Sequence, residues 1–354
     1  MSARAAEIAV DVVITNYNYA AFLGDAVESA LAQTHPALRV IVVDDGSTDD
    51  SRERLGAYDG RIEVVLKENG GQPSAFNAGM ERVRGDLVIF LDADDRLRPE
   101  AAARAAAAFA AEPELVKVQF RVAVVDGAGR PTGATKPPPH LEAPSGDLRR
   151  AELAFPFDLP WLPTSGNAFA AAALRRIFPI PERPGADLYP IYLTPLLGPV
   201  AALEEVGAEY RVHGRNAYEP EEPRLDLGHI RQVIEYTRHT TEALEELADD
   251  LELERPEPIL SQSDLAHRLI SLKLEPELHP VAGDTVSGLA ADAFRAAHRR
   301  FDVSPLMKVV FVAWFLATAA APRPLSRWLA ELFRFPERRR PLNRLLGRLQ
   351  RATS

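Results

Sequence analysis

The chain has 354 residues, a length that predicts two domains or one large domain with an extension. It contains no cysteine, which excludes disulfides, zinc–thiolate sites and cysteine nucleophiles and fits a reducing cytoplasm. The net charge is −10, but residues 322–354 carry nine arginines against two glutamates, so the first 321 residues carry −17. So acidic a body argues against nucleic-acid binding. The first residues lack the apolar segment of a secretory signal, and we expect a cytoplasmic protein.

Strands and helices are expected to alternate along the first 100 residues. Apolar runs predict the strands, and apolar residues at helical spacing predict the helices between them. Short alternation of this kind indicates an α/β fold with a mainly parallel sheet flanked by helices. The strands are expected at residues 8–15, 39–43, 62–66 and 87–91, and the helices at 21–31, 51–55 and 74–83.

Polar residues follow the end of each of these four strands. In an open α/β sheet, ligands bind beyond the carboxyl ends of the strands, so these residues predict a nucleotide site. An aromatic ring can stack on a base, a carboxylate can accept from a base N–H, and glycines let backbone amides approach a pyrophosphate. Taken singly, Asp-Gly-Ser and Gly-Gly are more often ordinary turns. The residues concerned are Thr15, Tyr17, Asp44, Asp45, Gly70, Gly71, Asp92, Asp94 and Asp95.

The fourth strand ends in three carboxylates within four residues, Asp92, Asp94 and Asp95. Charges so close together repel one another unless a cation joins them. A divalent ion that is held by one or two carboxylates and by substrate phosphates would meet that need. The alternative is an acidic turn in which Asp95 caps a helix.

The middle of the chain predicts a helix at 99–112, a strand at 115–125 and a hairpin turn at 126–130. Residues 136–146 are rich in proline and are expected to form a mobile loop near the acceptor or a passive linker. Further helices are expected at 188–197, 227–251, 264–274 with Ser263 as N-cap, and 289–300, with the acidic run 242–254 forming a solvated helix face.

Four blocks of the sequence resemble the family-2 inverting glycosyltransferases of the GT-A fold. They are VVITNYNYAAFLGDAVESALAQTHP, VIVVDDGSTDDS, ENGGQPSAFNAGMERVRGD and LVIFLDADD, and their order and spacing match over about the first 100 residues. One departure is Thr15-Asn16, which stands where a proline often follows the first strand. The resemblance implies a GT-A fold, a nucleotide-diphosphate sugar donor and Mg²⁺ or Mn²⁺.

The same resemblance implies roles for individual residues. Thr15 and Tyr17 would line the base pocket, and Asp45 would contact the base. Asp92 and Asp94 would form the DxD motif for donor ribose and metal, with Asp95 beside them as a further metal ligand.

Later segments resemble the acceptor half of the family. They include the small-polar segment 162–169, an aspartate that opens a helix, and Glu209–Asn216 with its YRVHGRN sequence. Asp187 would be the catalytic base, although Ala186 stands where many members have a glutamate; alternatively, Asp187 only caps the helix 188–197. His213 would bind the metal or the diphosphate, or be structural, and Arg211 or Arg215 would pair with phosphate oxygens.

The C-terminal part contains thirteen residues without a charge, 309–321. As a helix they would extend roughly 20 Å, which is shorter than the hydrocarbon core of about 30 Å. Arginines with interleaved leucines and aromatic residues follow, so segment 309–351 is typical of a helix at a membrane surface. The alternative is a buried helix whose arginines keep the end soluble.

Together these features predict a GT-A glycosyltransferase domain at 1–216, with a nucleotide-sugar half at 1–105 and an acceptor half at 106–216, and a helical region at 217–354. We expect an inverting, metal-assisted transfer of sugar to a glycan or lipid-linked acceptor in cell-surface polysaccharide synthesis, in the cytoplasm or on the inner face of the membrane. Two alternatives are an inactive scaffold with the same fold and a haloacid-dehalogenase-like phosphatase, for which Arg96 and the position of the motif on the fourth strand are unfavourable.

Overall fold

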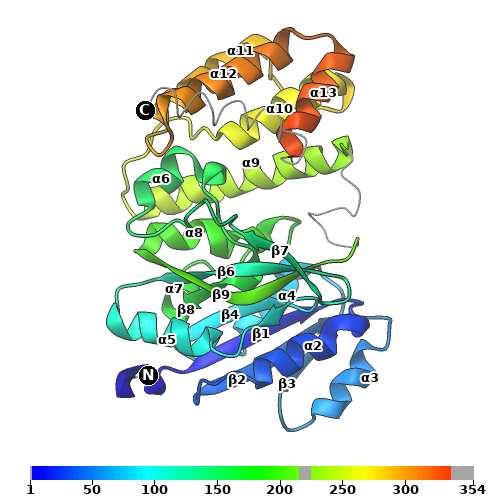
Figure 1. The fold of residues 1–354 in the computed structure, drawn as a ribbon, viewed down its shortest axis with the longest axis vertical. Helices are drawn as coiled ribbons and strands as arrows, with labels where there is room; N and C mark the ends of the chain where they lie inside the picture. The colour runs from blue at the N-terminus through cyan, green and yellow to red at the C-terminus, as the bar shows by residue number, and fades with distance from the viewer. Residues whose placement is uncertain (1, 215–224, 336–354) are drawn as a thin grey trace. The chain divides into compact units, whose positions relative to one another are not determined.

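The computed structural model describes residues 2–214 and 225–335. The chain divides into two compact units (Figure 1). Unit 1 comprises Met1–Leu153, Leu159–His213 and His239–Arg255, and unit 2 comprises Ala154–Asp158, Gly214–Arg238 and Pro256–Ser354.

Unit 1 is built on a nine-stranded sheet with the order β3-β2-β1-β4-β8-β6-β9-β5, to which β7 adds by pairing with β6. The first four strands along the chain pair in parallel, as predicted. Strands β8 and β5 run antiparallel to their neighbours, while β6 and β9 are parallel. The bounds are β1 Val10–Asn16, β2 Leu38–Asp45, β3 Glu63–Lys67, β4 Leu87–Asp92, β5 Arg96–Leu97, β6 Lys117–Asp126, β7 Pro131–Lys136, β8 Asn167–Ala170 and β9 Val200–Val212.

The helices agree with the predictions to within a few residues at most ends. One cap was wrong: α10 begins with Ser261 as its N-cap, not Ser263, and the Ser261 hydroxyl accepts from Asp264 N–H. The bounds are α1 Ala3–Glu7, α2 Ala20–Leu31, α3 Ser51–Leu55, α4 Gln72–Met80, α5 Ala101–Ala111, α6 Arg149–Ala154, α7 Ala171–Leu174, α8 Tyr189–Leu197, α9 Leu227–Asp250, α10 Gln262–Leu274, α11 Val286–Arg299, α12 Pro305–Ala320 and α13 Arg323–Arg334.

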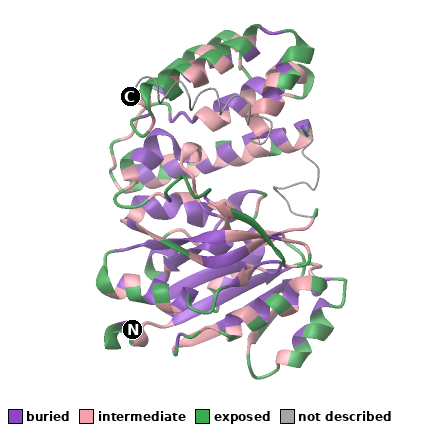
Figure 2. Ribbon diagram, viewed as in Figure 1, coloured by how far each residue is buried: buried purple, intermediate pink, exposed green. Residues whose placement is uncertain are grey.

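The two central strands of unit 1, β1 and β4, are buried along almost their whole length because both faces of the sheet are covered, and most of their residues are apolar. Leu23 and Val27 of α2 and Phe109 of α5 pack against residues of both strands in one core. Figure 2 shows these strands as almost wholly buried.

The strand register sets the site. Thr15 at the end of β1 lies opposite Asp92 at the end of β4, and Asn16 lies opposite Asp44 at the end of β2. The polar residues that follow three separate strands therefore meet at one edge of the sheet.

Helices α10 to α13 of unit 2 pack around two apolar clusters. One contains Leu265, Leu289 and Phe315, and the other contains Ile270 and Ala330. Within the described residues, no helix combines the length and the apolar character needed to cross a bilayer.

Candidate active site

Asp92 closes β4 and is tied to two other segments. Gln72, in the first turn of α4, donates from Nε2 to Asp92 Oδ1 over 2.7 Å. The backbone N–H of Asp92 donates to Ser165 Oγ over 3.2 Å. These contacts hold the end of the strand against α4 and against the loop that precedes β8.

Asp95 is buried, and both its carboxylate oxygens accept hydrogen bonds from the protein. Ser165 Oγ donates to Oδ2 over 2.7 Å, and the backbone N–H of Arg211 donates to Oδ1 over 2.9 Å. The alternative in which Asp95 caps a helix is wrong, because the short strand β5 follows it and α5 begins only at Ala101. Asp95 therefore joins β4, the loop before β8, and β9.

Asp94 and His213 are brought together, as the predicted metal site requires. His213 Nε2 lies 2.9 Å from Asp94 Oδ2. The imidazole stacks on the Phe22 ring with 4.7 Å between centroids, and its edge meets Tyr19. Two aromatic rings from the start of α2 thus fix the direction of the imidazole.

Arg211 is buried, and its guanidinium is directed at protein acceptors. Nε donates to the Asp94 carbonyl over 2.8 Å, and Nη2 lies 2.7 Å from Asp25 Oδ2. Nη1 donates to the Gly127 carbonyl, and the group lies over the Phe22 ring. In this arrangement Arg211 supports the backbone of the DxD segment, and a phosphate contact would require the guanidinium to turn away from these acceptors.

Asp187 lies in the 3-10 turn Ala186–Leu188 and is buried. The cap-only alternative is wrong: the N-cap of α8 is Leu188, and no side chain caps that helix end. Burial raises the pKa of Asp187 to about 6, although backbone N–H groups of Asp187 and Gly185 act to lower it. A carboxylate with that pKa can be charged at neutral pH and still accept a proton readily.

The pKa values of the carboxylates at the end of β4 are raised, in part because these groups repel one another when charged. Burial, then the charges of Asp94 and Asp187, raise the pKa of Asp92 to about 8. Burial, then the charges of Asp94 and Asp92, also raise the pKa of Asp95 well above its usual range. Because each carboxylate disfavours the charge of the next, a cation at this edge would be stabilised by all of them.

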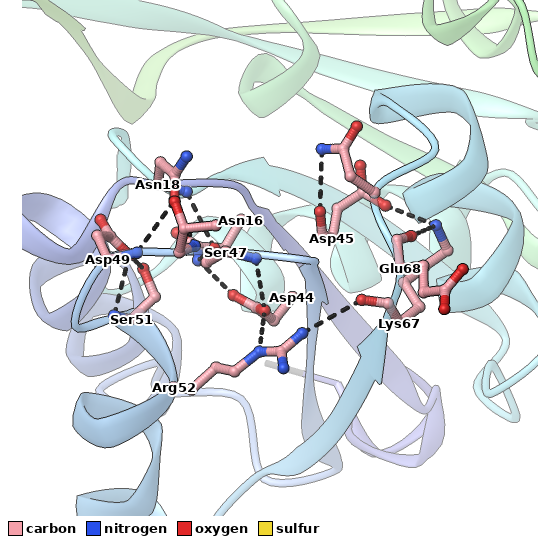
Figure 3. Close-up of polar contacts among 12 residues, drawn as sticks. Asn16, Asn18, Asp44, Asp45, Ser47, Asp49, Ser51, Arg52, Lys67 and Glu68 are labelled. Carbon is pink, nitrogen blue, oxygen red and sulfur yellow. Dashed lines mark hydrogen bonds and ion pairs between the residues drawn. The ribbon is translucent and has the colours of Figure 1, made fainter.

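The end of β2 is arranged differently (Figure 3). Asp44 is buried and accepts from Asn16 Nδ2, the Ser47 amide and Arg52 Nε. Burial acts to raise the pKa of Asp44, but these hydrogen bonds outweigh it, and the pKa is lowered. The negative charge of Asp44 is therefore already compensated inside the protein.

Asp45 and the Gly70-Gly71 pair lie together, as predicted for a ligand site, but their polar groups are hydrogen-bonded to each other. The amide of Gly71 donates to Asp45 Oδ2 over 2.8 Å, and that of Gly70 to Oδ1 over 3.1 Å. Lys67 Nζ lies 2.5 Å from the same carboxylate. These contacts among Asp45, Gly70, Gly71 and Lys67 are called here the lock. A base or pyrophosphate that bound to the same groups would have to break them. Of the two residues predicted for the base pocket, Thr15 is buried and Tyr17 is exposed.

Sequence reasoning missed several residues that build this site. Gln72 directly follows Gly71, and Ser165 lies in the small-polar segment, but neither carries a signal that names its partner. Asp25 sits on the exposed side of α2 in any helical projection, and only the fold brings it to Arg211. Arg215, a candidate for phosphate binding, lies outside the described residues.

The residues fit a metal ion that is shared with a ligand. Among residues 2–214 and 225–335, no group of three or more His, Cys, Asp or Glu side chains could hold a metal by itself. Asp94 and His213 form a pair of suitable donors, and an Mg²⁺ or Mn²⁺ ion bound there would take its other ligands from diphosphate oxygens and water.

Comparison with known proteins identifies the family. Residues 11–170 match the family described as "Glycosyl transferase family 2". The chain is 36% identical over 216 residues to an uncharacterised glycosyltransferase of Nostoc sp., covering 58% of this chain and 66% of the relative. It is 43% identical over 95 residues to TuaG of Bacillus subtilis, which is named as a glycosyltransferase for teichuronic acid biosynthesis, covering 26% of this chain and 38% of TuaG.

The fold also has a solved counterpart. The crystal structure of TarS residues 1–349 of S. aureus superposes with a TM-score of 0.53 at 17% identity and covers 92% of this chain and 91% of TarS 1–349. The fold is thus the expected GT-A glycosyltransferase fold with a helical C-terminal region, and the phosphatase alternative is wrong. Through residues 11–170, the chain is a member of glycosyltransferase family 2.

Proposed function

We propose that this protein is a nucleotide-sugar-dependent, inverting glycosyltransferase that acts on a hydroxyl of a glycan or lipid-linked acceptor. The proposal is supported by the placement of Asp187: this buried carboxylate lies in the turn Ala186–Leu188, which packs against α4, and Gln72 at the start of α4 donates to the DxD residue Asp92. A general base and a donor-binding carboxylate would thus lie close enough to serve the same reaction.

In the proposed reaction Asp187 accepts the proton of the acceptor hydroxyl as that oxygen attacks the anomeric carbon of the donor. The bond between the anomeric carbon and the diphosphate oxygen breaks, and its electron pair leaves with the diphosphate. Attack from the face opposite the leaving group inverts the anomeric configuration in one displacement. No covalent intermediate with the protein is needed.

Asp92 would hold the donor ribose, and Asp94 with His213 would hold Mg²⁺ or Mn²⁺. A metal ion bound there would supply positive charge for the departing diphosphate. The residues around this pair position it: Phe22 and Tyr19 orient His213, and Asp95 with Arg211 holds the backbone of the DxD segment.

Thr15 and Tyr17 would contact the nucleoside, with Tyr17 available for stacking because it is exposed. Asp45, Gly70 and Gly71 would contact the base and the diphosphate only if donor binding opened the lock that they form with each other.

Cell-surface polysaccharide synthesis is the setting we propose, supported by the similarity to a protein named for teichuronic acid biosynthesis. We place the protein in the cytoplasm or on the inner face of the membrane, where nucleotide sugars and lipid-linked acceptors meet. The chain spans about two thirds of its Nostoc relative and a smaller share of TuaG.

The proposal is tested by measuring release of nucleoside diphosphate from UDP-, GDP- and dTDP-sugars with Mn²⁺ or Mg²⁺, with and without a lipid-linked glycan acceptor. We expect turnover with one nucleotide, dependent on the metal and on Asp187. The anomeric configuration of the product, followed by proton NMR, should be opposite to that of the donor. Donor binding without turnover for any acceptor would favour the inactive scaffold, and retention would contradict the single displacement.

A further inference from the structure

Helix α12 of unit 2 has an exposed side that is apolar from end to end. Val309 is 64% exposed and Leu316 is 51% exposed. They belong to one row along the helix at alternating spacings of three and four residues, which places its members on one face. The row, called here the α12 stripe, consists of Leu306, Val309, Ala313, Leu316 and Ala320.

The opposite side of α12 already has its packing partners. Phe315 and Thr318 are buried, and Trp314 stacks on Phe333 of α13 with 4.8 Å between ring centroids. The Trp314 indole N–H also donates to the carbonyl of Leu329. The stripe is therefore an additional apolar surface and not the core-facing side of the helix.

Helix α13 is strongly amphipathic, but its apolar side is also used within unit 2. Ala330 is buried, and Phe333 contacts Trp314 and the edge of His267. What α13 exposes near its start is a mixed surface of Arg323, Leu325, Arg327 and Trp328. Within the described part of segment 309–351, it is therefore α12 that supplies a continuous exposed apolar surface.

All charges along this part of the chain are basic. From Pro305 to Arg327 the charged residues are Lys308, Arg323 and Arg327, of which Arg323 also lies 4.0 Å from Glu277. Only Ala321 and Pro322 separate α12 from α13, so the exposed arginines follow directly after the end of the stripe. The whole segment from 322 to 354 carries a local charge of +7.

We infer that unit 2 docks on an anionic lipid surface through the α12 stripe, helped by the exposed residues Arg323, Arg327 and Trp328 that follow the stripe along the chain. Apolar side chains that enter the interface lose their contact with water, basic side chains are drawn to anionic headgroups, and tryptophan is favoured where the two meet. A second copy of this chain is a poorer occupant, because pairing of two stripes would bring basic residues toward basic residues.

This inference names the membrane surface that the proposed function needs, but it does not depend on catalysis. It is tested by sedimenting the full chain with vesicles of phosphatidylcholine alone and of phosphatidylcholine mixed with phosphatidylglycerol. We expect binding to the mixed vesicles that weakens with added salt. An Asp187→Asn variant should bind vesicles as the wild type does, so loss of activity and loss of docking can be told apart.

The decisive variant is Val309→Glu/Leu316→Glu, which places two acidic side chains on the stripe. We expect vesicle binding to fall by at least about tenfold, since apolar burial is lost and anionic headgroups repel the new charges. The matched control is Leu66→Glu, which changes an exposed leucine of β3 in unit 1 and should leave binding unchanged. Circular dichroism and melting temperatures show that each variant is folded.

Three results would overturn the inference. They are equal binding to neutral and anionic vesicles, binding that survives the double substitution, and absence of binding. Light scattering adds one more: a dimer that the double substitution dissociates would make the stripe an interface between two copies of the chain. The Arg323→Gln/Arg327→Gln variant, which leaves the stripe intact, should lose preference for anionic vesicles.

Discussion

The ends of β2 and β4 lie at the same edge of the sheet, separated by β1, and the pKa values of their carboxylates are shifted in opposite directions. Asp44 receives hydrogen bonds from Asn16, Ser47 and Arg52, and its pKa is lowered. Asp92 receives one side-chain hydrogen bond, from Gln72, and its pKa is raised to about 8. Asp44 is fully buried and Asp92 only partly, so exposure does not explain the difference; the donors around Asp44 lower its pKa, whereas the charges of Asp94 and Asp187 help to raise that of Asp92.

This difference distinguishes carboxylates that stabilise the fold from carboxylates that can bind a ligand. A carboxylate whose charge is fully compensated by the protein contributes to stability and has little affinity left for a ligand. A group of carboxylates that repel one another favours an incoming cation. By this criterion we propose that the β2 end is structural and that the β4 end with Asp187 is the reactive site.

The largest effect is expected from Asp187→Asn, which removes the proposed base and keeps the shape of the side chain. Turnover should fall by about 10²–10⁴-fold, the usual contribution of a general base, while the affinity for donor changes little. Steady-state kinetics and donor titration on the same preparation measure both. Loss of donor affinity with unchanged turnover would assign Asp187 to binding.

The next effect contrasts two neighbouring aspartates. Asp94→Asn should abolish binding of Mn²⁺ in the presence of nucleoside diphosphate, as measured by electron paramagnetic resonance of the ion. Asp95→Asn should keep most of that binding, because both Asp95 oxygens serve protein donors and an amide oxygen can still accept from the Arg211 amide. Equal loss in the two variants would make Asp95 a metal ligand, as the family resemblance implies.

The pH dependence should follow Asp187. Its pKa in the folded protein is about 6, so the charged base is present above that pH and is lost as the pH falls through it. We therefore expect kcat/KM for the acceptor, measured at saturating donor, to decline below about pH 6, since it reports the enzyme form that the acceptor meets. A profile of kcat/KM against pH checks this, and the decline should be absent from the residual activity of Asp187→Asn.

The same raised pKa has a consequence for folding. The folded state holds the proton of Asp187 more tightly than the unfolded chain, whose pKa is near 3.8. The contribution of this group to the free energy of unfolding should therefore decrease as pH rises from about 4 to about 6. The Asp187→Asn variant lacks this group, so its free energy of unfolding should decrease less between pH 4 and pH 6 than that of the wild type. Urea unfolding at several pH values would detect the difference.

A smaller effect is expected from Asp44→Asn, which weakens the hydrogen bonding at the end of β2. The loss of charge-assisted hydrogen bonds leaves buried donors poorly satisfied and should lower the free energy of unfolding by about 1–3 kcal/mol. Because the pKa of Asp44 is lowered, this stabilisation is present in the wild type above the unfolded pKa and is lost at more acid pH. Urea unfolding measures the change; metal-dependent donor binding should survive in the folded fraction.

Much of this arrangement could be predicted because it depends on local patterns. Apolar runs that end in polar residues located β1, β2 and β4, and the rule for parallel sheets brought Thr15, Asp45 and Asp92 to one edge. The resemblance to the family placed His213 beside Asp94. The sequence could not show which carboxylates the protein itself would satisfy.

The missing information concerns distant partners and side-chain direction. Ser165 donates to Asp95, which lies seventy residues away in the sequence, and Arg211 of β9 pairs with Asp25 of α2. Neither pair has a spacing rule. Likewise, the uncharged run at 309–321 was visible in the sequence, but only the packing of Trp314 against Phe333 shows which side of α12 stays exposed. The part of segment 309–351 beyond Phe335 lies outside the described residues.

A thermal-shift panel would show whether the β4 end binds a nucleotide sugar together with a metal ion. UDP-, GDP- and dTDP-sugars are added with and without Mn²⁺ or Mg²⁺ to the wild type and to Asp94→Asn, since a ligand that binds the folded state raises the melting temperature. We predict a shift for one nucleotide that requires the metal and disappears in Asp94→Asn. No shift with any donor, or a shift that persists in Asp94→Asn without metal, would contradict the assignment of the site.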